Sequence, residues 1–349
     1  MARELRSHSL NGDKPDQFEP TCTVIICTRN HPAELDRCLE GVARLRYLKF
    51  DVLVVDNAPT DERAREVAAR WNARYITEPV AGLSRARNRG ARACDTEIVA
   101  FLDDDCVPEP EWLSWLVREF KNPSVMVVTG RVVPLSLQTE AERLSALAGF
   151  NSNGHGPRQV DRETPSWFEL ANFGGIGDGM NMAFRRRAFD VWPGFDERLG
   201  RGALIDGAEE HYAFFSLLKD GHLVVYTPYA VIRHPFPRDM KRLRERHLKD
   251  LASATAYITF LFAEQPRYRG AVIKYVLEAL RGTRREWRGQ AAGPRPRIVS
   301  RWRMLLAWLH GPLLYVQSCR RRPTAALSCP PACEEEQTAS VVSGRPGEP

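Results

Sequence analysis

Apolar runs of strand length alternate with helical patterns over residues 21–133. The strand-like runs end on polar residues and occupy 21–28, 50–58, 73–78, 97–105 and 124–133. The segments between them place apolar residues at helical spacing, at 32–45, 60–72, 83–94 and 110–120. This alternation predicts an α/β fold with a mostly parallel sheet that is flanked by helices on both faces.

The pattern changes further along the chain. Residues 135–173 are polar and are predicted to be irregular. A glycine-rich loop, an amphipathic helix and a strand pattern that ends on His234 follow. From 239 to 322 the pattern is helical and rich in arginine. It is interrupted near Pro266, Gly282 and Pro294.

These patterns divide the chain into four parts. We predict a flexible leader at 1–20, an α/β domain at 21–238 and a basic helical region at 239–322. The remaining segment, 323–349, is rich in Pro, Ser and Glu, a composition typical of a disordered tail.

Charge is distributed unevenly between these parts. The formal net charge is +6, yet residues 1–232 contain 28 Lys and Arg against 34 Asp and Glu. Residues 233–323 contain 21 basic against 6 acidic residues. This excess indicates either a solvated basic face or contact with an anionic membrane surface. The arginines are not interleaved with a nucleic-acid-binding motif, so we expect no nucleic-acid partner.

Hydropathy and cysteine usage predict the compartment. The two longest apolar runs, 251–263 and 304–316, are too short to span a bilayer. Most of the eight cysteines lie in apolar patterns that suit reduced, buried thiols, and Cys329 and Cys333 lack partners for a zinc site. We therefore predict a cytoplasmic protein, peripheral on the inner face of the membrane if 239–322 contacts lipid.

Polar side chains gather where the predicted strands end. Thr28, Arg29 and Asp56 follow two strands, and the triplet 103–105 follows another. In an open parallel sheet these ends form the ligand-binding edge. Three adjacent aspartates suit a turn with one helix cap, or Mg²⁺ or Mn²⁺ that bridges carboxylates to substrate phosphates.

Other motifs leave alternatives open. The turn "CTRNHPAE" has no glycine, which argues against a dinucleotide site, and the chain has no Walker A sequence. "GGIGDGMNMAF" suits a flexible turn or close approach to a ligand. "AEEHY" suits a favourable acidic first helical turn or a catalytic base. His234 suits a capped core residue or a metal ligand.

Taken together and in order, these motifs resemble family 2 of the glycosyltransferases with the GT-A fold. The resemblance covers residues 22–237. It depends on "VIICTRN", "VLVVDNAPTDE", "AGLSRARNRGARACDTEIVAFLDDDCVPEPEWL", "GDGMNMAFRRRAFDVWPGFDERLGRG", "GAEEHYAFFSLLKDGHLVVYTP" and "AVIRH". It implies an inverting, hexosyltransferase-type enzyme that uses a nucleotide-sugar donor, UDP-linked by default, and a saccharide or lipid-linked acceptor in glycan or polysaccharide biosynthesis.

The resemblance also implies roles for individual residues. The donor would be bound by Thr28, Arg29, Asp56, Arg85, Asn88, Asp103 and Asp104. Asp105 matches the metal-binding aspartate of the family's DxD motif, and His234 matches its late histidine ligand. The loop with Gly177, Asp178 and Asn181 would face the sugar and acceptor. Glu210 would be the general base, with Glu209 as its rival.

The sequence departs from the family pattern at three positions. The acidic pair usually reads Glu-Asp but is Glu209-Glu210 here, which adds one methylene of reach. His211 stands where a further acidic residue is common, and Cys106 stands where an aspartate is common. Metal binding is therefore left to the aspartates before Cys106.

Three other classes of protein share part of these patterns. "FLDDDCV" also fits haloacid-dehalogenase-like phosphatases, with Asp103 as nucleophile and Asp105 beside Mg²⁺, but those enzymes carry the motif on their first strand. Nucleotidyltransferases begin with a glycine-rich loop that this chain lacks. A non-catalytic carbohydrate-binding protein would need neither a metal nor a base.

Overall fold

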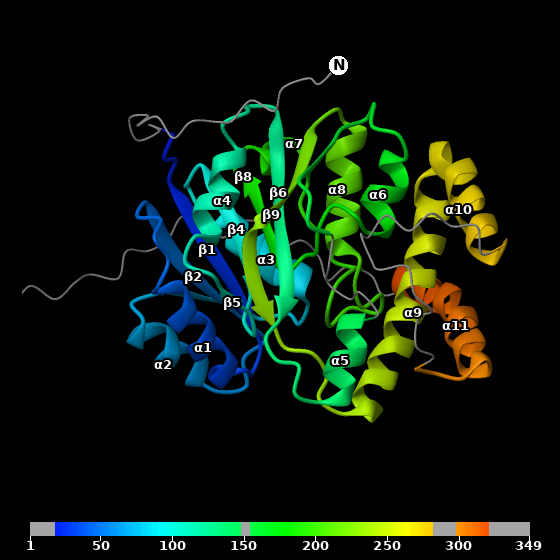
Figure 1. Cartoon of the computed structure of the whole chain (residues 1–349), viewed down its shortest axis with the longest axis horizontal. Coiled ribbons are helices and arrows are strands. Elements are labelled where there is room, and N and C mark those ends of the chain that lie inside the picture. The colour runs from blue at the N-terminus through cyan, green and yellow to red at the C-terminus, as the bar shows by residue number, and fades with distance from the viewer. Residues whose placement is uncertain (1–17, 148–153, 282–297, 321–349) are drawn as a thin grey trace, which may run out of the picture.

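The computed structural model describes residues 18–147, 154–281 and 298–320 (Figure 1). Nine strands form one sheet: β1 Cys22–Thr28, β2 Phe50–Asn57, β3 Arg74–Glu78, β4 Ile98–Asp103, β5 Val107–Pro108, β6 Val125–Pro134, β7 Arg158–Val160, β8 Asn181–Arg185 and β9 Leu223–His234. Eight helices precede the last strand: α1 Pro32–Val42, α2 Arg63–Arg70, α3 Leu83–Arg92, α4 Trp112–Glu119, α5 Glu140–Leu147, α6 Trp167–Phe173, α7 Ala188–Val191 and α8 Glu209–Lys219. Beyond β9 lie α9 Met240–Glu264, the short 3₁₀ helix η1 Pro266–Tyr268, α10 Arg269–Arg281 and α11 Arg301–Arg320.

The sheet confirms the mostly parallel α/β prediction. Its strand order is β3-β2-β1-β4-β8-β6-β9-β5, and β7 pairs with β9. Strands β1 to β4 run parallel, whereas β8 lies antiparallel to both β4 and β6. The register places Thr28 beside Asp56 and Cys27 beside Asp103. The carboxyl ends of three strands therefore meet at one edge, as expected for a ligand site.

Helices cover both faces of the sheet. Successive residues of β1 alternate between the two layers: Ile25 belongs to one core cluster, and Val24 and Ile26 belong to the other. All three side chains are fully buried. Burial on both faces explains why the strand reads as a continuous apolar run rather than as an alternating pattern.

The prediction for residues 135–173 is wrong, because the structure contains α5, β7 and α6 in this segment. Helix α6 is held by aromatic packing from distant parts of the chain. Trp167 stacks on Phe215 at a centroid distance of 6.0 Å, and Phe168 stacks on Tyr268 at 5.5 Å. Contacts of this kind stabilise a helix that has little amphipathic pattern of its own.

The C-terminal helices follow the predicted pattern. Helix α9 begins after Asp239, whose side-chain oxygen accepts a hydrogen bond from the Arg242 backbone N–H at 2.8 Å. The predicted interruption near Pro266 is confirmed, because α9 ends at Glu264 and η1 begins at Pro266. The two further interruptions, the tail and nearly all of the leader lie outside the described residues.

Helix α11 crosses α9 at a position without a side chain. A Cβ atom added to Gly311 would lie 2.0 Å from Thr255 Oγ1 and 2.6 Å from the Ala252 carbonyl oxygen. The two backbones can approach this closely only because residue 311 is glycine.

In the described residues, no helix is long and apolar enough to cross a membrane.

We expect Gly311→Leu to loosen the contact between α11 and α9. The added side chain has no space, so the free energy of unfolding should fall by about 1–3 kcal/mol, measured by urea denaturation. The matched control is Leu313→Ala, because Leu313 lies two residues away and is 57% exposed. Its effect should stay within about 0.5 kcal/mol. Equal effects of the two substitutions would contradict the close crossing.

Candidate active site

The aspartate triplet after β4 is divided among three sets of partners. Thr28 Oγ1 donates a hydrogen bond of 2.6 Å to Asp104 Oδ2, and His31 Nδ1 lies 3.3 Å from the same oxygen. The pKa of His31 is raised, chiefly by its hydrogen bond to Asp104. Asp103 and Asp105 contact different groups. The three carboxylates are therefore kept apart, which reduces their mutual repulsion.

The Asp103 carboxylate faces Arg87, which is buried in α3 with only 2% of its surface exposed. Arg87 Nη2 donates to Asp103 Oδ1 at 3.0 Å and to the Gly179 carbonyl oxygen at 2.9 Å, and Nη1 donates to Glu209 Oε1 at 2.7 Å. Although burial opposes the charged form, Asp103 and Glu209 raise the pKa of Arg87 above its usual range. One guanidinium thus joins β4, the glycine-rich loop and α8.

The turn before α3 fixes where Arg87 lies. At the end of β2, Asn57 Oδ1 accepts a 2.8 Å bond from the Gly82 N–H, and Asn57 Nδ2 donates to the Val80 carbonyl oxygen at 2.7 Å. Gly82 has φ +149°, a conformation that favours glycine. These bonds hold the start of α3 against the sheet edge, so that Arg87 reaches the end of β4 one turn later.

Sequence reasoning missed Arg87 as a functional residue. A signal was present, because four buried residues of α3 follow the i, i+3, i+4, i+7 spacing of a core-facing helical stripe: Ser84, Arg87, Asn88 and Ala91. An arginine on such a stripe requires buried anionic partners. The aspartates of the following strand and the acidic pair of α8 are the available ones.

The two adjacent glutamates of α8 have different environments. Glu209 is 5% exposed and is bound by Arg87. Burial and the neighbouring Glu210 raise the pKa of Glu209 to about 7, against the opposite effect of Arg87. Glu210 is only half-buried, and burial is the main cause that raises its pKa. Among the described residues, Glu210 is therefore the member of the pair that does not accept a hydrogen bond from Arg87, although the charge of Arg87 acts to lower its pKa.

Asp105 and His234 meet at the end of β9, as expected of two metal ligands. Asp105 Oδ2 lies 3.5 Å from His234 Nε2. Burial lowers the pKa of His234 to about 4, and burial together with Asp103 and Asp104 raises the pKa of Asp105 to about 7. A neutral imidazole beside a carboxylate of raised pKa is a donor set that suits a divalent cation.

Asp105 and His234 are two protein ligands, fewer than a divalent cation needs to complete its coordination. Within the described ranges, no group of three or more His, Cys, Asp and Glu residues gathers around a common point. Mg²⁺ and Mn²⁺ commonly take one or two protein ligands and complete their coordination with phosphate oxygens and water. Asp105 and His234 fit that pattern.

Asp56 forms a second polar position at the edge of the sheet. Its side chain is buried, and Tyr75 Oη donates a 2.8 Å hydrogen bond to Asp56 Oδ2. The other oxygen, Oδ1, is buried and has no hydrogen-bond partner among the residues that the structure describes. Burial raises the pKa of Asp56. A ligand N–H group would satisfy Oδ1.

The two predicted arginines lie on the outer side of this edge. Arg29 is exposed directly after β1, near Gly202. Arg85 is half-buried, and its Nη2 forms an ion pair of 2.8 Å with Glu197 Oε2. Arg29 is thus exposed to solvent, whereas Arg85 would have to share its charge with Glu197.

Two asparagines predicted to contact substrate are buried and make structural contacts. Asn88 binds the Phe195 backbone through both ends of its amide, at 2.9 and 2.8 Å. Asn181 is fully buried; its Oδ1 accepts from Trp112 Nε1 at 2.7 Å and its Nδ2 donates to the Arg131 and Ala230 carbonyl oxygens. Asn181 Nδ2 uses both of its N–H groups in these bonds, whereas Asn88 Nδ2 uses one. The contact of either residue with donor or acceptor stays a prediction.

The predicted acceptor loop approaches the acidic pair through two of its residues. Gly177 has φ +143° and packs on Thr129, where a Cβ atom would lie only 2.3 Å from the threonine Cβ. Asp178 is buried, and its charge contributes to the raised pKa of Glu210. Gly179 lies against Arg87 and Glu210. Asp178 and Gly179 are thus the loop residues next to the acidic pair.

A second loop, residues 199–207, was not recognised from the sequence. Its carbonyl oxygens accept bonds from α3, namely Leu199 O from Ser84 Oγ at 2.7 Å and Arg201 O from the Leu83 N–H at 2.9 Å. Arg201 also forms ion pairs with Asp206 at 2.7 Å and with Asp250 of α9 at 3.3 Å. The first C-terminal helix therefore supports a loop beside the acidic pair.

Residues 23–192 match the family model described as Glycosyl transferase family 2. A pre-mycofactocin glycosyltransferase of Mycobacterium tuberculosis is 30% identical over 217 residues, which cover 61% of this chain and 42% of that protein. A glucosyl-dolichyl phosphate glucuronosyltransferase of Haloferax volcanii is 28% identical over 230 residues, which cover 61% of this chain and 68% of that protein. The chain thus spans less than half the length of the first relative.

Among solved structures, the fold is similar to that of a mannosyltransferase from Pyrobaculum calidifontis in complex with GDP-Man and Mn²⁺. The TM-score is 0.52 at 18% sequence identity, covering 87% of this chain and 74% of that one. At this identity the likeness establishes the fold alone. The family match favours sugar transfer over the phosphatase alternative.

We expect Arg87→Met to lower the free energy of unfolding by about 3–5 kcal/mol, because Asp103 and Glu209 would lose their shared cation. Urea denaturation would measure the loss. Arg87→Lys should have an intermediate effect, because an ammonium lacks the fork that reaches both carboxylates. Arg89→Met is the matched control, since Arg89 is exposed on the same helix. A loss no larger than that of Arg89→Met would contradict the central position of Arg87.

Proposed function

Because the chain belongs to glycosyltransferase family 2, with the GT-A fold predicted from its motifs, we propose that it transfers a sugar from a nucleotide-diphosphate donor to an acceptor hydroxyl with inversion. A UDP-linked hexose is the default donor. The observation that carries this proposal is the division of the acidic residues between two sets of contacts: Asp105 faces His234, whereas Glu210 of α8 lies beside Gly179 and His211. Metal-assisted departure of the nucleoside diphosphate and removal of the proton from the acceptor hydroxyl each need their own acidic group.

The donor would lie across the carboxyl ends of β1, β2 and β4. The unsatisfied Oδ1 of Asp56 suits an N–H of the nucleotide base, and Arg29 suits the phosphates. Asp103 and Asp104 would approach the ribose and diphosphate. Arg87 and Thr28 hold these two carboxylates in fixed rotamers, so little reorganisation accompanies binding.

Asp105 and His234 would hold Mg²⁺ or Mn²⁺. The cation would neutralise the charge that develops on the departing nucleoside diphosphate. The histidine contributes a neutral donor, since burial lowers its pKa to about 4. The carboxylate contributes the negative charge, and the neighbouring charges of Asp103 and Asp104 favour any arrangement that adds positive charge there.

Glu210 would remove the proton of the acceptor hydroxyl as this oxygen attacks the anomeric carbon. A base needs a carboxylate that is accessible and has a raised pKa, so that it accepts a proton near neutral pH. Glu210 has both properties, whereas Glu209 is held by Arg87 and is better suited to orienting it. Attack from the face opposite the leaving group gives the inverted product.

The acceptor class is the least constrained part of the proposal. Asp178 and Gly179 lie beside Glu210 and would contact the acceptor or the transferred sugar. One relative is described as acting on a glucosyl-dolichyl phosphate, which supports a lipid-linked saccharide here. A free saccharide is the alternative.

A panel of nucleotide sugars, assayed for nucleoside diphosphate release with Mn²⁺ or Mg²⁺, tests this function. Glu210→Gln should lower kcat by about 10²–10⁴-fold and leave donor binding intact. Asp105→Ala should weaken metal-dependent donor binding, measured by titration calorimetry. Asp190→Ala is the control, because Asp190 is exposed on α7. Unchanged turnover in both site variants would rule out the assigned roles.

The pH dependence of kcat/KM tests the base directly. Because the pKa of Glu210 is raised, activity should fall as the pH drops through a value above 4.5, the usual pKa of a glutamate. Asp178→Asn removes a negative charge that raises this pKa, so the acidic limb should move to lower pH. Asp190→Asn should leave the limb in place. A shift to higher pH in Asp178→Asn would contradict the assignment.

A further inference from the structure

Helix α11 exposes apolar side chains around almost its entire circumference. Only Gly311 and Ser318 are buried among its twenty residues. Leu314 and Tyr315 are partly buried against the core. Eight other large apolar side chains are between 37% and 67% exposed: Trp302, Met304, Leu305, Leu306, Trp308, Leu309, Leu313 and Val316. A helix that is apolar on all sides is normally buried in a core or in lipid. Among the residues that the structure describes, α9 is the helix that covers α11.

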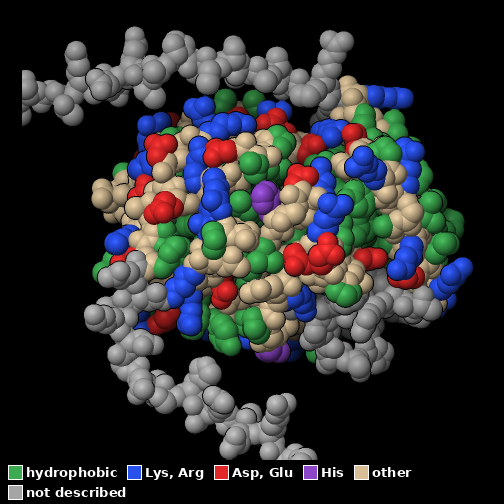
Figure 2. Space-filling model, turned by 90° about the horizontal axis from the view of Figure 1, so that it is seen from above, with side chains coloured by type: hydrophobic (Ala, Val, Ile, Leu, Met, Phe, Trp, Pro, Cys, Tyr) green, Lys and Arg blue, Asp and Glu red, His purple; other side chains and the backbone are tan. Residues whose placement is uncertain are grey.

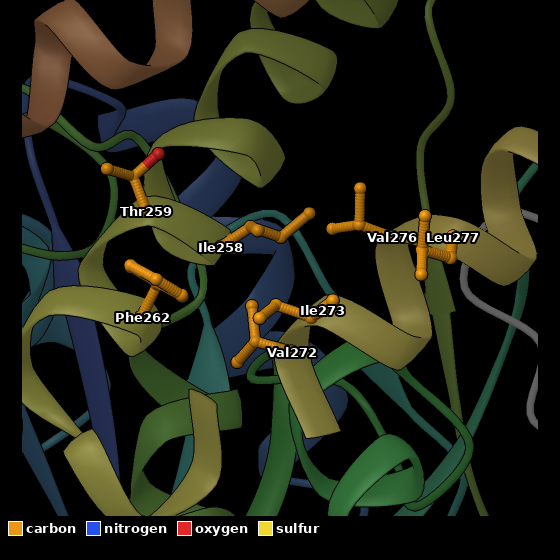
Figure 3. Close-up of a pocket in the computed structure, with 7 residues that line it drawn as sticks. All are labelled: Ile258, Thr259, Phe262, Val272, Ile273, Val276 and Leu277. Carbon is orange, nitrogen blue, oxygen red and sulfur yellow. The ribbon is translucent and has the colours of Figure 1, made fainter. Parts of the chain in front are cut away.

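Helix α10 extends the apolar surface along α9. Ile273, Leu277 and Leu280 are between 42% and 71% exposed, and Phe262 of α9 is 42% exposed beside them. A groove between the two helices is lined by Ile258, Thr259, Phe262, Val272, Ile273, Val276 and Leu277 (Figure 3). The lining contains a single polar side chain, Thr259. In Figure 1, α10 and α11 both lie at the right-hand edge, on the far side of α9 from the sheet.

The same surface is basic. Helix α11 has three exposed arginines, Arg301, Arg303 and Arg320, and no acidic residue. The segment of η1 and α10 has four exposed basic residues against one glutamate: Arg267, Arg269, Lys274 and Arg281, with Glu278. Viewed from above, apolar side chains with Lys and Arg between them gather at the same right-hand edge (Figure 2).

Exposed apolar side chains together with exposed arginines favour a membrane surface over a second copy of the chain as the partner. Two copies of the chain would bring like-charged arginine-rich surfaces together, which disfavours a symmetric dimer through this face. Exposed tryptophans flanked by arginine are typical of helices that lie in a membrane interface, where the indole rings reach the headgroup level. Lys and Arg near an anionic leaflet add electrostatic attraction.

We propose that α10 and α11 bind the surface of an anionic bilayer. The apolar side chains enter the boundary between headgroups and acyl chains, and the arginines contact lipid phosphates and carboxylates. The helices lie on the membrane without crossing it. This binding does not depend on the sugar-transfer proposal, since no residue of the acidic site takes part in it.

Vesicle flotation of the full chain tests this surface. At low salt the protein should float with vesicles of phosphatidylcholine and phosphatidylglycerol, and much less with phosphatidylcholine alone. Leu309→Glu/Leu313→Glu should lower the partition coefficient by more than about tenfold, because two exposed apolar side chains would no longer enter the interface. The control is Leu48→Glu, an 89% exposed leucine just before β2 that should leave binding unchanged.

Two further measurements separate the outcomes. Arg301→Glu/Arg303→Glu should abolish the preference for anionic vesicles, and brominated lipids should quench the tryptophan fluorescence of the unmodified chain. Absence of flotation, or flotation unchanged in the Leu309/Leu313 variant, would overturn the proposal. A concentration-dependent dimer that this variant abolishes, without flotation, would assign the face to a second copy of the chain instead.

Discussion

Repulsion between carboxylates is the constraint on which the rest of this site depends. Asp103, Asp104 and Asp105 leave one strand end together, and Glu209 and Glu210 approach them from α8. Arg87 makes this arrangement stable, because its guanidinium binds Asp103 and Glu209 at the same time and takes the Gly179 carbonyl oxygen as well. Its planar fork matches three acceptors in a way that a lysine could not.

Pairing by Arg87 also gives adjacent, chemically identical residues different properties. Glu209 is bound and enclosed, so Glu210 alone retains an accessible carboxylate. Within the triplet, Asp103 and Asp104 have fixed partners in Arg87 and Thr28, so Asp105 is the one that faces the histidine. Environment rather than residue type therefore decides which carboxylate can do which task.

The sequence contained enough information to predict the fold and the ligand edge. Strand ends are marked by abrupt changes from apolar to acidic residues, and parallel pairing then brings Thr28, Asp56 and Asp103 together without further information. The aromatic packing that forms α6 was not predictable, because Trp167 meets Phe215 only in the folded chain. Asn88 belongs to the motif that implies donor binding, and the structure adds that its amide binds the Phe195 backbone. A motif identifies residues that occur together but does not say which of them support the others.

The hydrogen bonds of Asn181 determine the register of strand β8 against its neighbours. Met182 and Phe184 belong to one core cluster and Ala183 to the other, so sliding β8 by two residues would replace one apolar side chain by another. Hydrophobic burial would hardly distinguish the two alignments. The Asn181 amide does, because only the observed alignment supplies Trp112, Arg131 and Ala230 as partners. A slipped strand would leave a buried amide without hydrogen bonds, so this polar residue confers uniqueness where apolar packing is degenerate.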